Sequence, residues 1–148
     1  MPAMTASAPQ RRDVITVWVP GTPRATQSGS VVRVQRPGRK DRLVPLRRGT
    51  AWARTCKAEA IRQYRGAPLH GEVWASLVFH LRRPKKSHPV APMTKRPDVD
   101  GLSKGLLDAW NGVLWCDDAQ ITRLTLVKIY SDTPGVTVEV RAITPVAP

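Results

Sequence analysis

The sequence predicts one α+β domain, in which two main helices pack on a mixed sheet of about four strands. Three observations favour this fold. A strand with strict apolar alternation lies in the middle of the chain, a segment with helical spacing lies on each side of it, and two strand segments close the sequence. The expected order is therefore strand, helix, strand, helix, strand, strand, and 148 residues give room for one such domain.

The first half of the chain supplies one strand, a basic hairpin and one helix. Val14–Val19 is β-branched and aromatic and ends at a Pro-Gly pair, which predicts a strand. Val31–Val34 and Leu43–Leu46 are expected to pair as a short basic hairpin. Thr50–Arg65 is expected to form a helix capped by its threonine. Residues at a spacing of four would form its buried stripe: Trp52, Cys56, Ala60 and Tyr64.

The second half supplies the remaining strands and the second helix. Glu72–Arg83 alternates with apolar residues on both faces, so we expect it to lie centrally in the sheet. Pro84–Pro97 is rich in Pro and Lys and is predicted to be a loop. Asp98–Gly112 has acidic residues at its start and Asn-Gly at its end, as a helix would. Ile121–Tyr130 and Val136–Ile143 are two further predicted strands, joined by a turn.

The charge of the chain predicts a nucleic-acid partner. Lys and Arg number 24 against 11 Asp and Glu, which leaves a formal net charge of +13. The excess lies in residues 1–97, with twenty basic and four acidic side chains, whereas residues 98–148 hold four and seven. Seventeen of the cations are Arg, whose guanidinium group suits paired contacts to phosphate. Such a surface attracts polyphosphate without reading a base sequence, although a solvated surface that binds nothing is the alternative.

Other classes of protein are disfavoured. No stretch approaches the ~20 apolar residues that a membrane helix needs, and the first ten residues lack the apolar core of a signal peptide, so a cytoplasmic location is expected. Residues 1–12 are expected to form a disordered basic tail before a domain at 13–145. Cys56 and Cys116 are too few for a disulfide framework or structural zinc. Cysteine or histidine catalysis is disfavoured because no histidine lies near Cys116 in sequence.

A cluster of aspartates points to a metal site. Five of the eleven acids lie within residues 98–118, namely Asp98, Asp100, Asp108, Asp117 and Asp118. Clustered carboxylates repel one another and raise each other's pKa, so they need a cation to offset them. Hard oxygen ligands of this kind select Mg²⁺ or Mn²⁺, the ions of phosphodiester chemistry.

Spacing tests whether the two parts of this cluster can meet. A helix over Asp100–Asn111 rises about 18 Å, and six extended residues over Gly112–Asp117 cover about 20 Å. The chain could therefore run back along the helix and bring the late aspartates to Asp98. The alternatives are an exposed ion-pair ladder of Asp100, Lys104 and Asp108, a simple N-cap at Asp98, and a turn at the late pair.

Residues 96–121, RPDVDGLSKGLLDAWNGVLWCDDAQI, resemble the signature of the RusA family of Holliday-junction endonucleases, D-x-D-N-L-x-K-x-x-x-D-A followed by D-D-x-Q. The resemblance extends more loosely to Pro20–Arg24. It implies that Asp98, Asp100 and Asp118 are catalytic metal ligands and that Lys104 is the catalytic lysine. Gly101 stands where the family commonly has Asn, which weakens the helix start and puts the orientation of the ligands in doubt.

The resemblance further implies a bacterial, prophage or phage-encoded homodimer that cuts four-way DNA junctions in recombination and repair with Mg²⁺, for which Mn²⁺ should substitute. No small-molecule cofactor and no membrane are expected. The side chains expected to contact DNA phosphates are Arg24, Arg82, Arg83, Lys85, Lys86, Lys95 and Arg96. Two alternatives stay open, a non-catalytic basic DNA-binding protein and a metal nuclease for other branched DNA.

Overall fold

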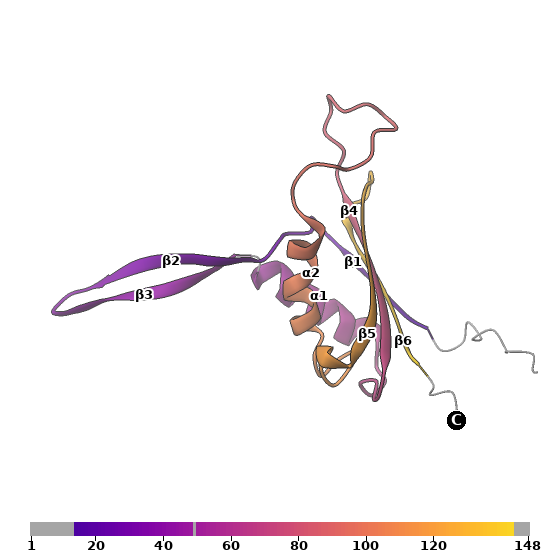
Figure 1. The fold of residues 1–148 in the computed structure, drawn as a ribbon, viewed down its shortest axis with the longest axis horizontal. Coiled ribbons are helices and arrows are strands. Elements are labelled where there is room, and N and C mark those ends of the chain that lie inside the picture. Colours follow the sequence, from indigo (N-terminus) through magenta and orange to yellow (C-terminus); the bar gives the residue numbers. More distant parts are fainter. Residues whose placement is uncertain (1–13, 49, 144–148) are drawn as a thin grey trace, which may run out of the picture.

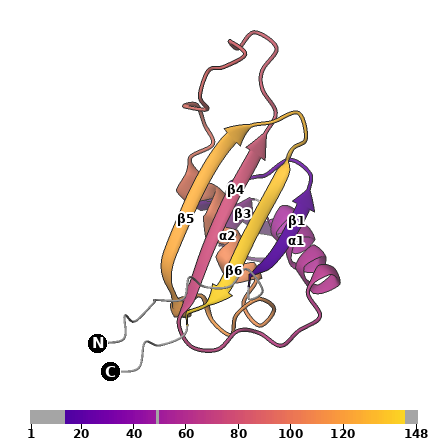
Figure 2. The same ribbon diagram turned by 90° about the vertical axis from the view of Figure 1, so that its right-hand side faces the viewer.

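The computed structural model describes residues 14–48 and 50–143, and its main body is a four-stranded sheet with two helices on one face (Figures 1 and 2). The elements are β1 (Ile15–Pro20), β2 (Gln27–Arg36), β3 (Arg39–Arg48), α1 (Thr50–Gln63), β4 (Val73–Leu81), α2 (Val99–Ala109), the short 3₁₀ helix η2 (Asp118–Gln120), β5 (Ile121–Tyr130) and β6 (Gly135–Ala142). The predicted α+β class and order of elements are confirmed. The tail expected at residues 1–12 lies outside the described residues.

The sheet is mixed and has the strand order β1-β6-β4-β5. Strand β4 is central, as predicted, and pairs antiparallel with β6 and parallel with β5. Although β5 and β6 follow each other in sequence, the turn between them crosses the end of β4, so they are not neighbours in the sheet. The connection from β4 through α2 to β5 is a β-α-β unit, and α2 therefore runs opposite to both strands (Figure 2).

The hydrophobic core lies between the sheet and the helices. The alternating residues of β4 that face the helices are all buried: Val73, Ala75, Leu77, Phe79 and Leu81. The predicted stripe of α1 packs on them, with Trp52, Cys56 and Ala60 buried and Tyr64 half-buried. Burial raises the pKa of the Cys56 thiol to about 12, so this sulfur is an inert core group at neutral pH.

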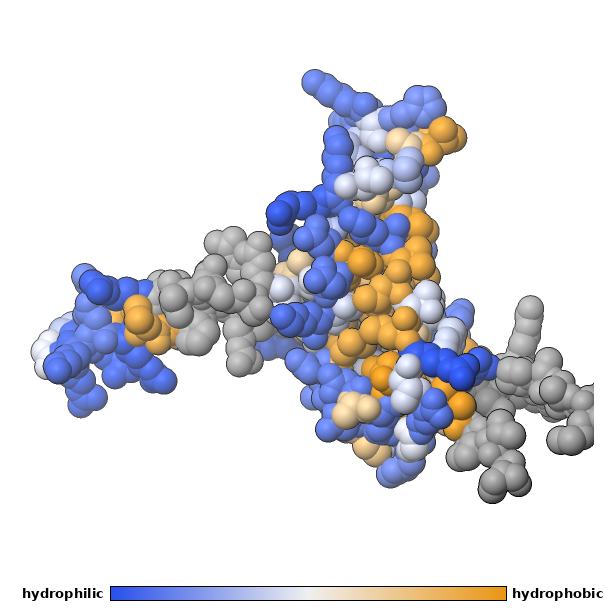
Figure 3. Space-filling view, viewed as in Figure 1, coloured by the Kyte–Doolittle hydropathy of each residue, from blue (hydrophilic) through white to orange (hydrophobic). Residues whose placement is uncertain are grey.

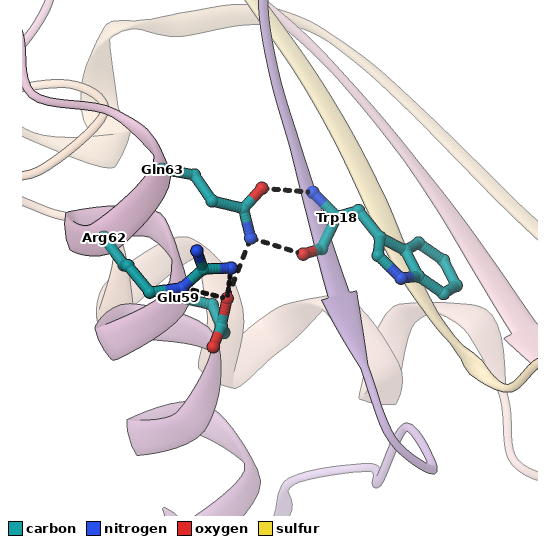
Figure 4. Close-up of polar contacts among 4 residues, drawn as sticks. All are labelled: Trp18, Glu59, Arg62 and Gln63. Atoms are coloured by element: carbon teal, nitrogen blue, oxygen red, sulfur yellow. Dashed lines mark hydrogen bonds and ion pairs between the residues drawn. The ribbon is translucent and has the colours of Figure 1, made fainter.

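The two edge strands of the sheet, β1 and β5, differ in how their outer backbone groups are covered. At the β1 edge, the Gln63 side chain accepts from the Trp18 backbone N–H at 3.0 Å and donates to the Trp18 carbonyl at 2.6 Å, in the manner of an added strand (Figure 4). Glu59 holds this amide at 2.9 Å and also binds Arg62. The β1 edge is thereby capped, which protects it from pairing with other chains.

The opposite edge, β5, has no neighbouring strand on its outer side within the described part of the chain. Leu124, Val127 and Ile129 are exposed along it, at 41%, 39% and 39%. Figure 3 shows apolar side chains gathered over this side of the sheet. This edge therefore combines unpaired backbone groups with apolar side chains.

Strands β2 and β3 form a two-stranded hairpin that projects away from the main body (Figure 1). The predicted pairing is confirmed, and the strands are longer than the apolar segments that suggested them. The cations of its outer part are all exposed: Arg33, Arg36, Arg39, Lys40 and Arg42. None of the helices in the described residues is long and apolar enough to span a membrane.

Candidate active site

The amino end of α2 presents the first two predicted ligands. Asp98 occupies the N-cap position with extended backbone (φ −73°, ψ 145°), and Asp100 lies in the first turn. Asp98 thus has the N-cap position that the alternative predicted, but its side chain makes no capping hydrogen bond. Both side chains are exposed. The positive end of the helix dipole stabilises two carboxylates here without neutralising them.

This end of the helix is fixed to the carboxyl half of β5. Lys128 donates from Nζ to the carbonyls of Lys95 and Pro97, at 2.8 and 3.0 Å. Arg83 folds into the preceding loop, where it donates to the His88 carbonyl at 2.8 Å and stacks 4.7 Å from the ring centroid of Tyr130. The predicted loop at 84–97 is confirmed, and its contacts place Asp98 and Asp100 near the end of β5.

The carboxyl end of α2 is packed into the core. Trp110 and Trp115 are fully buried and meet edge to face, with ring centroids 6.1 Å apart. Trp115 donates from Nε1 to the Asn111 side chain at 2.8 Å, and Gly112, at φ +76°, donates to the Trp115 carbonyl at 2.7 Å. Residues 112–116 therefore curl beneath the helix end. The return of this segment along α2, which chain length allows, does not occur, since burial of Trp115 holds the segment at the carboxyl end of the helix.

The late aspartate pair follows this turn. Asp117 accepts from the Ala119 backbone N–H at 3.0 Å, while Gln120 accepts from the Asp117 N–H at 2.7 Å, which forms a reciprocal capping box. Gln120 also donates to the Leu69 and Gly71 carbonyls and so fixes η2 to the body. Asp117 thus has a structural role, which leaves Asp118 as the partly buried carboxylate of the pair.

The charges around Asp118 disfavour its ionised form. The hydrogen bond that it shares with Asp117 raises the pKa of Asp118, and desolvation and the Asp108 carboxylate raise it further. The Asn111 side chain opposes this shift. The Ala119 N–H is the largest cause of the lowered pKa of Asp117. The charged groups near Asp118 are therefore acidic, and a bound cation would offset them.

The predicted ligands fall into two groups at opposite ends of α2. Asp100 and Asp108 are eight helical residues apart, a rise of about 12 Å. Along β5, the seven residues from Ile121 to Lys128 cover about 23 Å. Within residues 14–48 and 50–143, no group of three or more His, Cys, Asp or Glu side chains is placed to hold a metal ion. The donor chemistry suits a hard dication, but one chain does not bring the three predicted ligands together.

Comparison with known proteins identifies the family. The family described as Endodeoxyribonuclease RusA matches residues 20–141, which is most of the chain. The chain belongs to the RusA family. A relative in Bacillus subtilis (strain 168), "Uncharacterized protein YqaN", is 42% identical over 50 residues, and the match covers 34% of this chain and 35% of that protein. The chain thus spans about a third of the relative's length in this match.

The remaining RusA-type motif positions lie along the exposed face of α2. Asp100, Lys104 and Asp108 are all exposed there, as the predicted polar face requires, while Leu102 and Leu106 are buried. Lys104 lies one turn from each acid, between the two carboxylate groups. The assignments of Asp98, Asp100, Asp118 and Lys104 as catalytic residues stay predictions.

Gly101, where the RusA family commonly has Asn, lies where another segment of the chain crosses α2. Residues 25 and 26 cross α2 here, and Thr26 donates its backbone N–H to the Gly101 carbonyl at 3.0 Å. A Cβ on Gly101 would lie 3.4 Å from the Ala25 Cβ, and one on Gly105 would lie 2.3 Å from the Thr26 hydroxyl oxygen. The departure from the family pattern thus accompanies a close crossing of the helix.

Most of the side chains predicted to contact DNA are accessible. Six of them are exposed, namely Arg24, Arg82, Lys85, Lys86, Lys95 and Arg96. The seventh, Arg83, is half-buried and already bonded within its loop, which suits it better to shaping the loop than to binding phosphate.

Sequence reasoning missed a contact between Cys116 and His70, whose Nδ1 lies 3.5 Å from the sulfur. Both side chains are exposed. No sequence pattern predicts this contact, because His70 and Cys116 are brought together by the backbone bridge between Leu69 and Trp115.

Proposed function

We propose that this protein is a metal-dependent, structure-selective endodeoxyribonuclease that resolves four-way (Holliday) DNA junctions by phosphodiester hydrolysis. It would act as a homodimer in recombination and repair, with Mg²⁺ as its cofactor and Mn²⁺ as a substitute. The observation that carries this proposal is the match to the RusA family over residues 20–141, with the aspartate and lysine positions of the motif intact.

The placement of the charges supports catalysis over simple DNA binding. Exposed cations at residues 82–96 directly precede Asp98 and Asp100 in the chain, and the β2–β3 hairpin carries a second set of exposed cations. A protein that only packages DNA gains nothing from acids in such a surface, since they repel phosphate. The hydrogen bond with Asp117, burial and the Asp108 carboxylate raise the pKa of Asp118, and groups with a perturbed pKa are common at functional sites.

The chain's own residues suggest a division of roles. The exposed cations of the 82–97 loop would hold the DNA backbone through phosphates and orient the scissile strand over the aspartates. Lys104, on the exposed face of α2, would stabilise negative charge that develops on the phosphate or on the leaving oxygen. Asp98, Asp100 and Asp118 would hold the cation, which when bound neutralises phosphate charge and activates water.

The test compares synthetic substrates of equal length and end sequence: a four-way junction, a flap, a fork and a duplex. Wild type is expected to introduce paired nicks in the junction when Mg²⁺ or Mn²⁺ is present. Asp100→Asn is expected to keep its binding of the junction and to cut it about 10²–10³-fold more slowly. Asp132→Asn, an exposed acid in the β5–β6 turn, is the matched control and should cut normally.

Two outcomes would contradict the proposal. If wild type binds the junction tightly in Mn²⁺ and leaves it whole, the chain is a non-catalytic DNA-binding protein. If flaps or forks are cut faster than the junction, the enzyme is a nuclease for other branched DNA.

A further inference from the structure

We infer that the β2–β3 hairpin is a DNA-binding arm. It extends from the candidate active site beside one duplex arm of the substrate, and its tip, residues Arg36–Lys40, contacts the DNA about one helical turn from the cut. This inference rests on the proposed function for the identity of the partner. The position, length and charge of the hairpin come from the fold and the sequence.

The base of the hairpin is fixed beside the first two predicted metal ligands. The segment that leads into β2 crosses the amino end of α2, where Thr26 donates its backbone N–H to the Gly101 carbonyl at 3.0 Å. Gly101 directly follows Asp100, and β2 begins at the residue after Thr26. The hairpin therefore starts at the turn that carries Asp98 and Asp100, and a DNA strand held at these aspartates would pass its base.

The length of the hairpin sets where its tip can reach. Each strand has ten residues, which rise about 33 Å from base to tip. The hairpin projects away from the sheet and the helices instead of lying on them (Figure 1). One turn of B-form DNA covers about 34–36 Å, or about 10 base pairs. A duplex arm that leaves the aspartates beside the hairpin would therefore meet the tip about one turn from the scissile phosphate.

The outer part of the hairpin, residues 33–44, has the charge that a phosphate backbone attracts. It holds five cations and one acid, a formal charge of +4, and Figure 3 shows mostly hydrophilic side chains there. Arg42 pairs with Val34, the residue after Arg33. Because cross-strand partners share a face and successive residues alternate, Arg33 and Arg42 point to opposite faces of the ribbon.

Cations on both faces of a ribbon suit a DNA groove, because a groove has a phosphate backbone on each side, whereas a flat surface would contact one face. The major groove is about 12 Å wide and admits a two-stranded ribbon, and the minor groove is only about 6 Å wide. The major groove of a duplex arm is therefore the site that fits this hairpin.

The hairpin also exposes apolar side chains that a partner would cover. Val34, Leu43 and Val44 are exposed at 42%, 63% and 36%. A two-stranded ribbon without such cover is only marginally stable in water, so contacts with a partner would stabilise it. The ion pair between Arg33 and Asp41, at 3.7 Å, is exposed on both sides and contributes little, which leaves Arg33 available to phosphate. The charge of the ribbon favours DNA as that partner.

Junctions with arms of different length test the inference without cleavage. Four-way junctions with arms of about 7 and about 15 base pairs are compared, one shorter and one longer than a helical turn. Short loops close the ends so that the short arms stay paired, and divalent metal is omitted. Wild type is expected to bind the long-armed junction about 10-fold more tightly. A variant with Arg36→Ala, Arg39→Ala and Lys40→Ala should bind both junctions as wild type binds the short one.

Two further measurements locate the contact. For the long-armed junction, the slope of log affinity against log salt concentration should fall by up to about 2.7 in the tip variant, since three phosphate contacts are lost. Hydroxyl-radical footprinting should show protection about 10 base pairs from the cut position in wild type and none there in the variant.

The matched control removes the same charge from another surface. Arg54→Ala, Lys57→Ala and Arg65→Ala replace three exposed cations on α1 and just after it. This control should keep the wild-type preference for long arms. Equal loss of that preference in the control and in the tip variant would show an effect of net charge alone and would overturn the inference. A tip variant that keeps the wild-type preference would overturn it as well.

The outcomes separate the failure of this inference from the failure of the proposed function. If wild type prefers long arms but cuts no junction in Mg²⁺ or Mn²⁺, the nuclease assignment fails and the DNA-binding arm stands. If wild type cuts the junction but binds both arm lengths equally, the arm is refuted and the nuclease assignment stands. If the tip variant binds DNA as wild type does but sediments in a different oligomeric state, the hairpin contacts another copy of the chain and the inference is refuted.

Discussion

At its amino end α2 presents Asp98 and Asp100 on an exposed turn that follows Lys95 and Arg96 in the chain, whereas Asp118 follows a turn at the carboxyl end that is held in the core by two buried tryptophans. The first end is open to a DNA backbone. The second is anchored in the core and is rich in like charge. The RusA motif is continuous in sequence, but its two parts are held by different contacts: Lys128 holds the amino end of α2, and the buried tryptophans hold the carboxyl end. Variants at the two ends should therefore behave differently.

Trp110→Ala should have the largest effect, and it should act at the carboxyl end. Its fully buried ring packs against Trp115 and donates to the Cys56 carbonyl at 3.1 Å. Truncation should cost about 3–5 kcal/mol of the free energy of unfolding. Urea denaturation measures this loss. Trp74→Ala, on the half-buried outer face of β4, is the control and should cost clearly less. Equal losses would mean that the turn is not a core element.

Asp100→Asn and Asp118→Asn should each lower the rate of junction cleavage by about 10²–10³-fold. Their stabilities should differ. Asp118→Asn removes like-charge repulsion and should raise the midpoint of thermal unfolding at pH 7 by a few degrees. Asp100 is exposed on a helix start, so its replacement should leave stability unchanged or slightly lower. A thermal shift that is the same in both variants would argue against the difference between the ends.

The pH dependence of Mn²⁺ binding should reveal the shared hydrogen bond. The folded-state pKa of Asp118 is raised, so this carboxylate takes up a proton at a higher pH than an ordinary aspartate. Mn²⁺ affinity should therefore fall early as the pH decreases. Asp117→Asn removes the neighbouring charge and should move that fall to lower pH. The free energy of unfolding is lowered by ionised Asp118 at a pH above the raised folded-state pKa of this carboxyl group. Below about pH 3.9, the ordinary pKa of aspartate, the group is protonated in both the folded and the unfolded state, so Asp118→Asn should give no stabilisation there. An unmoved binding profile in Asp117→Asn would contradict the coupling.

The smallest effect concerns two glycines of α2 as a matched pair. Gly101→Ala meets only the Ala25 Cβ at 3.4 Å and should gain up to about 1 kcal/mol from helix propensity. Gly105→Ala meets the Thr26 hydroxyl oxygen at 2.3 Å, so the crossing segment must shift and that gain should be lost. Thermal unfolding of the two variants measures the difference. A larger gain for Gly105→Ala would show that the crossing is loosely packed.

Local patterns in the sequence predicted the elements but not their arrangement. The alternation of β4 predicted the strand and its central position in the sheet, and the spacing of α1 predicted its buried stripe. Strand order could not be read, because the insertion of β6 between β1 and β4 depends on packing across the whole sheet. Chain length likewise showed that Asp117 and Asp118 could reach the start of α2. It could not show that burial of Trp115 turns the chain the other way.

An anomalous diffraction map from crystals grown with Mn²⁺ tests the central claim most directly. We predict a manganese peak within coordination distance of the Asp98 and Asp100 carboxylates at the amino end of α2. A map with manganese bound elsewhere, and none at these two aspartates, would contradict it.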